Sequence, residues 1–172
     1  MSDPRDVTAD DLLHLERQLG RAPRGVRAIP ARCPCGWPAL VETEPRLPDG
    51  TPFPTFWYLT CRRLNAVLST LESEGLMRGM QDRLVDDAAL RDRYRAAHQH
   101  YLAARDSVTR VEEIADYSAG GMPDRVKCLH ALVAHSLAAG PGINPFGDEA
   151  LAVVGQRGAW PHEGLCVTED RA

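Results

Sequence analysis

The segment that most constrains the fold is residues 125–138, RVKCLHALVAHSLA, because it is apolar nearly all the way round. A helix that is hydrophobic on every side has to be buried inside a protein. This one nevertheless contains a thiol, two imidazoles and the single lysine of the chain, namely Cys128, His130, His135 and Lys127. We therefore predict a buried central helix that also supplies the chemistry of the protein.

The hydrophobic periodicity along the rest of the chain predicts an α+β fold. Short β-prone runs near the N-terminus predict a small antiparallel sheet, and helical spacing of apolar residues predicts a mostly helical body packed against it. The predicted strands are residues 26–29, 39–43 and 56–60, and the predicted helices are residues 8–19, 61–74, 77–84, 87–110, 123–139 and 148–154. Residues 1–155 are predicted to form a single domain, followed by a flexible tail over residues 156–172.

Composition argues against several classes of protein. The net charge is -4 and acidic and basic residues are interleaved, whereas nucleic-acid binders usually present a basic face. No apolar run approaches the roughly 20 residues that span a bilayer, and the N-terminal sequence lacks the apolar segment of a signal peptide. We therefore expect a cytoplasmic protein with reduced cysteines, without a nucleic-acid partner and without a membrane association.

Four cysteines form the first candidate site. Cys33 and Cys35 lie in a tight turn between the first two predicted strands, Cys61 where the third strand gives way to a helix, and Cys128 near the start of the central helix. Four thiolates satisfy a tetrahedral zinc ion or an iron–sulfur cluster. Zinc is the first choice because no redox partner motif is present.

The cysteine spacing leaves other roles open. A zinc ribbon has two Cys-x-x-Cys pairs, whereas this chain has one Cys-x-Cys and two isolated cysteines. Buried structural thiols, or thiols with a redox or nucleophilic role, are the alternatives. Cys166 lies in the predicted tail and is not counted as a ligand.

The residues before the central helix, SAGGMP, form the second candidate site. Paired glycines before a helix let backbone N–H groups converge on an anion, and the helix dipole favours negative charge. The predicted anion-binding residues are Gly120, Gly121, Arg125 and Lys127, with Pro123 at the first helical position. The alternative is an ordinary turn.

Three residues of this region are candidates for catalysis: Lys127, His130 and His135. Lysine can lose its proton, whereas arginine, which supplies every other basic side chain except histidine, cannot. Either histidine would serve as a general acid or base, although a hydrogen-bonded core histidine is the structural alternative. His98 and His100 are predicted on the solvated side of the 87–110 helix.

Three long strings give the sequence a resemblance to a known family. They are RQLGRAPRG, RCPCGWPALVETEPRLPDGTPFPTFWYLTC and SAGGMPDRVKCLHALVAHSLAAGPGINPFGDEAL, and the likeness runs from about residue 12 to residue 151. The chain resembles an uncharacterised actinobacterial family, the domain of unknown function numbered five hundred and one. The resemblance implies a cytoplasmic bacterial protein whose family motifs include the thiols, Lys127 and the histidines. It also implies that the gene for this protein lies near those for enolase, a septum-formation initiator and an exopolyphosphatase.

Three functional hypotheses follow. The first is a thiolate zinc or iron–sulfur site that joins the N-terminal sheet to the central helix. The second is an enzyme or binding protein for a small anionic, phosphate-like ligand held by Lys127 and Arg125. The third is a protein-interaction module linked to cell division or central metabolism, which uses the exposed faces of residues 76–110. The sequence leaves open whether the protein is an enzyme, which partners it has and its oligomeric state.

Overall fold

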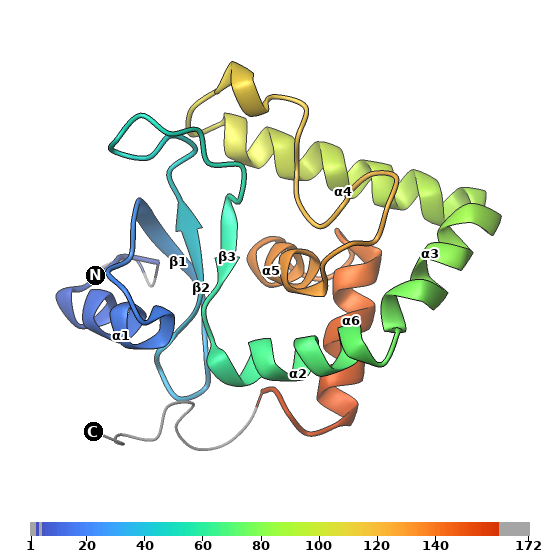
Figure 1. Ribbon diagram of the computed structural model, residues 1–172, viewed down its shortest axis with the longest axis horizontal. Coiled ribbons are helices and arrows are strands. Elements are labelled where there is room, and N and C mark those ends of the chain that lie inside the picture. Colours follow the sequence, from blue (N-terminus) through green and yellow to red (C-terminus); the bar gives the residue numbers. More distant parts are fainter. Residues whose placement is uncertain (1–2, 4, 162–172) are drawn as a thin grey trace.

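The computed structural model describes residue 3 and residues 5–161, and it confirms the predicted α+β fold (Figure 1). A three-stranded antiparallel sheet lies near the N-terminus, and helices and loops form the rest of the described chain. In chain order the elements are α1 (Ala9–Leu19), β1 (Val26–Arg32), β2 (Pro38–Thr43), β3 (Trp57–Leu59), α2 (Arg62–Ser73), α3 (Leu76–Asp86), α4 (Ala88–Asp106), a 3-10 turn (Glu112–Ile114), α5 (Leu129–Ala139) and α6 (Pro145–Gln156).

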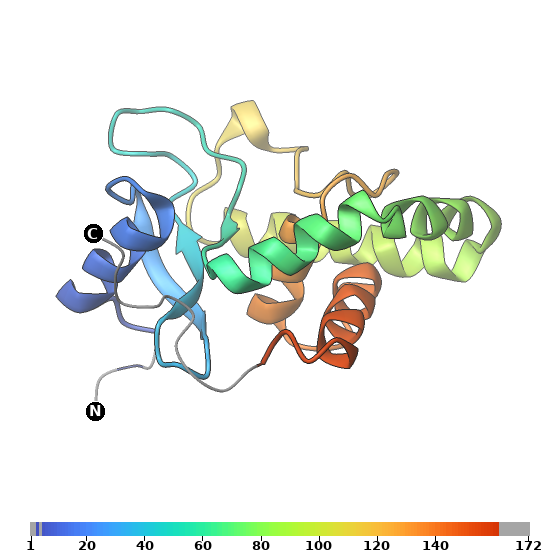
Figure 2. The same cartoon turned by 60° about the horizontal axis from the view of Figure 1, so that its bottom comes forward.

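The sheet has the order β1-β2-β3 and separates α1 from the helical body (Figure 2). Every residue of β2 is buried, because α1 packs on one face and α5 on the other. β1 continues to Arg32, beyond the predicted end, although it contains Pro30. An edge strand tolerates proline, and the register of β1 against β2 shifts at several points along its length.

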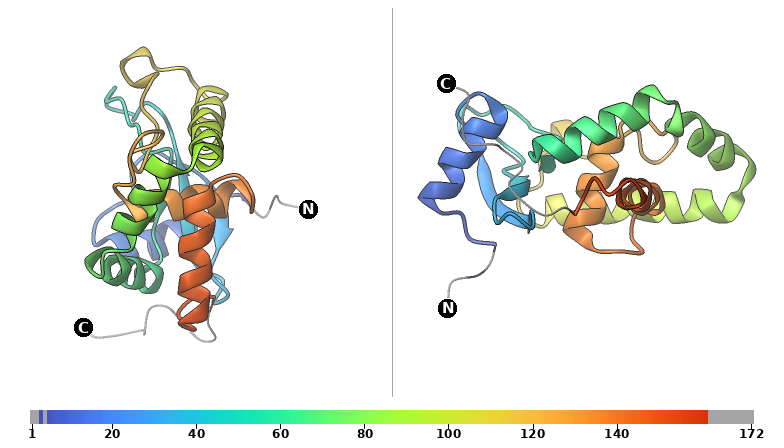
Figure 3. Two further views of the ribbon diagram at one scale, coloured as in Figure 1. Left: turned by 90° about the vertical axis from the view of Figure 1, so that its right-hand side faces the viewer. Right: turned by 90° about the horizontal axis from the view of Figure 1, so that it is seen from below.

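Helix α5 is the predicted buried central helix, and the structure confirms its position. It packs against β3, α2 and α6, and α2 and α4 flank it on two sides (Figure 3). Leu129, Leu132, Val133 and Ala134 are fully buried. These apolar side chains join the sheet and helices α2, α3, α4 and α6 into a single cluster of core residues.

The predicted start of this helix at Pro123 is wrong, because α5 begins at Leu129. The backbone N–H groups of the preceding residues are used elsewhere: Val126 donates to Gln81 Oε1 (2.9 Å) and Lys127 donates to Gly120 O (2.8 Å). Gly120 has a φ of 67°, and a Cβ there would lie 2.6 Å from Leu132 Cδ2. The glycine therefore lets this loop close tightly over α5.

Two smaller predictions also change. His98 is buried rather than solvated, because the loop after α4 covers it and Ser118 Oγ lies 2.8 Å from its Nδ1. Helix α6 begins earlier than predicted, at Pro145, with the Asn144 side chain as its cap. Residues 162–172, including Cys166, lie outside the described residues, so the predicted tail stays a prediction. No helix in the described part of the chain is both long and apolar enough to cross a membrane.

Candidate functional site

Helices α2 and α5 bring a thiol, an imidazole and a carboxylate together. Cys128 is the N-cap residue of α5, His130 lies in the first turn of that helix, and Glu72 lies in the last turn of α2. One ligand atom from each lies within 4.8 Å of the others, which makes this the one such group of three among the described residues. The sequence singled out Cys128 and His130 but assigned them to different sites, and it missed Glu72.

His130 is held between two hydrogen-bond acceptors. Its Nδ1 lies 3.2 Å from Glu72 Oε1, and its Nε2 lies 3.1 Å from the backbone oxygen of Asn65. A neutral imidazole has one N–H, whereas a carboxylate and a carbonyl oxygen can only accept. Both contacts are therefore satisfied at once only by the doubly protonated imidazolium.

The charges around His130 also favour the protonated imidazole. The Cys128 side chain raises the pKa of His130 to about 9, and the Glu72 carboxylate contributes to the increase, while partial burial opposes it. His130 is therefore protonated at neutral pH. Its contacts come from one face of α2, since Asn65, Ser69 and Glu72 follow helical spacing, and Ser69 Oγ also lies 3.3 Å from Nε2.

Cys128 is a second partner of this imidazolium, farther from Nδ1 than the Glu72 carboxylate. Its Sγ lies 3.9 Å from His130 Nδ1. Burial raises the pKa of the Cys128 thiol, but the His130 side chain and the backbone N–H of Ala131 more than offset burial, and the net pKa lies below the usual thiol value. A position at the start of a helix favours a thiolate in the same way. The pair thus tends toward a thiolate and an imidazolium.

The Cys128–His130 pair opens into a cavity of about 580 Å³. The cavity lies between β3, the start of α2, the start of α5 and the loop that contains Ser118 and Gly120. Asn65 Oδ1 also belongs to this region and has no hydrogen-bond partner among the described residues, although its Nδ2 donates to Leu59 O (3.3 Å). The cavity therefore offers a nucleophilic sulfur to a small molecule, while Asn65 Oδ1 is buried in its wall.

His135, the other predicted catalytic histidine, lies in a separate buried network. Its Nε2 is 3.0 Å from His100 Nδ1, and its Nδ1 is 3.1 Å from Asn144 Nδ2. Burial lowers the pKa of His135 to about 3, and His100 adds to the decrease. Its ring stacks on Trp57, with 5.1 Å between the centroids. The structure therefore places a neutral His135 in the core and away from His130.

The predicted anion-binding residues are not gathered at a helix start. Arg125 and Lys127 are exposed on the extended segment before α5, and Gly121 closes that loop by accepting from the Arg125 N–H (2.9 Å). The actual start of α5 is occupied by an acidic side chain, since the Leu129 N–H donates to Glu72 Oε1 (2.7 Å). The protein's own carboxylate thus takes the place that an external anion would use.

The predicted cysteine ligands fall into two places. Cys33, Cys35 and Cys61 belong to one part of the core at the end of the sheet, where Ala39 O accepts from the Cys61 N–H (3.3 Å). Cys61 is the N-cap residue of α2, as predicted. The Cys128 sulfur instead lies within 4.8 Å of a Glu72 oxygen, and the helical rise places Glu72 about 16 Å along α2 from Cys61. Cys128 therefore lies apart from the other three cysteines.

Comparison with known proteins agrees with the resemblance seen in the sequence. The family model described as "Protein of unknown function (DUF501)" matches residues 29–152. This span covers most of the chain and includes the three residues of the α2–α5 group. Searches of curated proteins and of solved structures found no match. The chain therefore belongs to the DUF501 family of proteins of unknown function.

Proposed function

We propose that this protein is an enzyme in which the Cys128 thiolate is the nucleophile and the His130 imidazolium is its partner. The observation behind the proposal is that both ring nitrogens of His130 face acceptors while the thiol sits 3.9 Å from Nδ1. A thiolate is the reactive form of cysteine, and a neighbouring imidazolium stabilises it.

Each residue of the group has a role in the proposed chemistry. Cys128 Sγ forms a bond to an electrophilic carbon of a substrate in the cavity, such as an acyl carbon, and the bond to the leaving group breaks. The Nδ1 proton of His130 passes to the leaving group, and water then cleaves the thioester. Glu72 keeps the imidazole charged and oriented. The thiolate and carboxylate together outweigh the imidazolium, which favours neutral or cationic substrates.

Alkylation with iodoacetamide tests the proposal directly. Peptide mapping by mass spectrometry would follow each cysteine separately, with glutathione as the reference for an unperturbed thiol. We expect Cys128 to react well below the pH at which glutathione reacts, and Glu72→Gln to change the pH profile of Cys128. Alkylation of Cys128 with the pH profile of glutathione would contradict the proposal.

A second candidate function is zinc binding, because sulfur, nitrogen and oxygen donors lie within 4.8 Å of one another at Cys128, His130 and Glu72. Three protein ligands leave a fourth position for water or substrate, as in catalytic zinc sites. Zinc would have to displace the proton of His130 Nδ1. The zinc or iron–sulfur site was predicted from Cys128 together with the sheet-end cysteines, and those three cysteines are the competing location for a metal.

Metal content separates these locations. The chain would be purified without a metal-binding tag, and zinc and iron would be measured for the wild type, Cys128→Ser and Cys61→Ser. Loss of metal in Cys128→Ser alone supports the α2–α5 group, and loss in Cys61→Ser alone supports the sheet-end thiols. Cys166→Ser tests the remaining cysteine of the chain. A metal-free wild-type protein with a stable fold would rule out both locations.

The other two hypotheses stay predictions. A phosphate-like ligand at Lys127 and Arg125 would show as phosphate binding that is lost in Lys127→Gln. A protein partner at the exposed faces of α3 and α4 would show as a stable complex with the purified candidate partner.

A further inference from the structure

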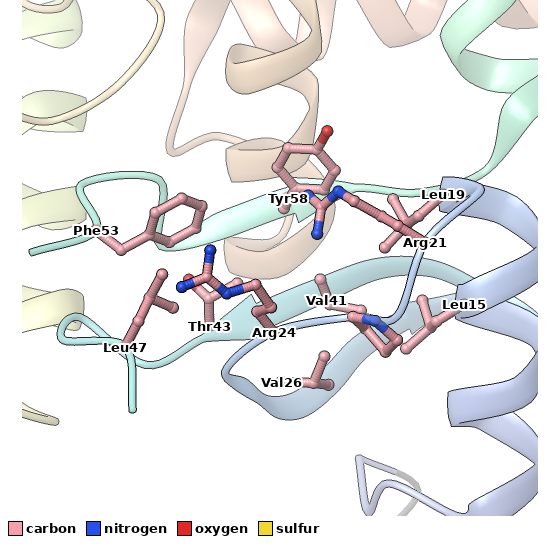
Figure 4. Close-up of a pocket in the computed structure, with 11 residues that line it drawn as sticks. Leu15, Leu19, Arg21, Arg24, Val26, Val41, Thr43, Leu47, Phe53 and Tyr58 are labelled. Carbon is pink, nitrogen blue, oxygen red and sulfur yellow. The ribbon is translucent and has the colours of Figure 1, made fainter. Parts of the chain in front are cut away.

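A second cavity, of about 200 Å³, lies on the opposite face of the sheet from α5 (Figure 4). Its floor is made by side chains of the three strands, including Val26 of β1, Val41 of β2 and Tyr58 of β3. Leu15 and Leu19 of α1 close one side, and the loop between β2 and β3 closes the other with Leu47 and Phe53. It shares no lining residue with the Cys128 cavity except Tyr58.

Most of the residues that line this cavity are apolar. Two residues of the floor carry a hydroxyl: Thr43 Oγ1 donates to Thr55 O (2.7 Å), and Tyr58 is exposed. Gly25 lets the α1–β1 loop approach the opposite wall, because a Cβ at this position would lie 2.7 Å from Leu47 Cδ2. The cavity therefore favours the aliphatic body of a ligand rather than a polar one.

Two arginines of the α1–β1 loop supply positive charge at this apolar cavity. Figure 4 shows the side chains of Arg21 and Arg24 among the lining residues. Arg24 pairs with Asp49, and both side chains of that pair are about half exposed. Arg21 donates to the neighbouring Ala22 O (3.4 Å) and forms no ion pair with a described residue. One guanidinium at the cavity is thus open to an external anion.

We infer that this cavity binds a small anionic amphiphile, with a carboxylate on Arg21 and a short acyl chain against Leu15, Val41 and Phe53. Charge complementarity selects the head, because guanidinium and carboxylate match in shape and charge. The apolar walls select the body, because a purely polar anion would leave them exposed to water. The size of the cavity selects a single short chain over a diacyl lipid. This inference is independent of the chemistry proposed for Cys128.

Calorimetric titration of the full chain with octanoate tests the inference. Acetate supplies the head without the chain, and 1-octanol supplies the chain without the charge, so both should bind more weakly than octanoate. Arg21→Gln should weaken octanoate binding by about tenfold and leave 1-octanol unchanged, since a charge-assisted hydrogen bond is lost. Arg63→Gln, at an exposed arginine of α2, is the matched control and should bind octanoate like the wild type. Phe53→Ala should weaken the binding of octanoate and of 1-octanol to the same extent.

Several results would overturn the inference. The first is an absence of octanoate binding. The second is equal affinity of the wild type and Arg21→Gln for octanoate. The third is a loss of octanoate affinity in Arg63→Gln as large as that in Arg21→Gln. Sedimentation of the protein with phosphatidylglycerol vesicles, without binding of monomeric octanoate, would assign the arginines to a lipid surface instead. Alkylation of Cys128 is measured separately, so failure here would leave the nucleophile proposal standing.

Discussion

Replacing His130 with glutamine should sharply reduce the reactivity of Cys128. In the wild type, burial raises the pKa of the thiol, and the His130 side chain at 3.9 Å helps bring it below the usual value. Glutamine removes the positive charge, while burial and the negative charge of Glu72 remain, and both favour the neutral thiol. The pKa of Cys128 should therefore rise above the usual thiol value.

The size of the effect follows from the ionisation equilibrium. Below its pKa, a thiol loses about tenfold of its thiolate fraction for each unit by which the pKa rises, equivalent to about 1.4 kcal/mol. We expect the rate of iodoacetamide alkylation at Cys128, measured at pH 6.5 by mass spectrometry, to fall by about tenfold or more in His130→Gln. In His14→Gln, a substitution on α1 beyond the sheet, iodoacetamide should alkylate Cys128 at the wild-type rate. Equal rates in the wild type and His130→Gln would refute the ion pair.

Three further predictions concern stability and protonation. The raised pKa of His130 should stabilise the fold fully below about pH 6.5, the ordinary pKa of imidazole, and this stabilisation should be lost as the pH rises through about 9. The urea midpoint should therefore fall over this range more in the wild type than in His130→Gln. Arg105→Met should lower the free energy of unfolding in urea by about 2–4 kcal/mol, because the buried guanidinium donates to Ile114 O (2.7 Å) and the substitution leaves this carbonyl without its donor. Arg95→Met, at an exposed arginine, should leave the free energy of unfolding unchanged. His135 should keep neutral ring NMR shifts down to about pH 4, and its burial should destabilise the protein as pH falls below 6.5, where the unfolded imidazole takes up a proton.

The burial of α5 could be predicted because its own composition requires it, but its first residue could not. Pro123 suits the start of a helix by local geometry. The N–H of Val126 instead donates to Gln81 Oε1 (2.9 Å), from a helix more than forty residues earlier in the chain. Such a contact has no signature in the local sequence. The anion site was predicted at a helix start at Pro123, and α5 does not start there.

Only part of the candidate site could be predicted from the sequence. Cys128 and His130 stood out because a thiol and an imidazole are unusual in an apolar helix. Glu72 could not be assigned to them, since packing of α2 against α5 alone brings it within 3.2 Å of His130. A signal did exist: Asn65, Ser69 and Glu72 form a polar stripe beside the apolar stripe of Leu64, Leu68 and Leu71. Polar residues that follow a buried stripe at helical spacing indicate a facing polar partner.

The arrangement of α2 makes the proposed chemistry depend on the integrity of a single helix. Contacts to His130 come from three successive turns of α2, at Asn65 O, Ser69 Oγ and Glu72 Oε1. Fraying of its last turn would carry Glu72 away from both the imidazole and the Leu129 N–H. Local opening of α2 would therefore release the His130 imidazole from its fixed orientation beside Cys128 well before the protein unfolds. Amide exchange in the last turn of α2 and the alkylation rate of Cys128 should respond together to temperature.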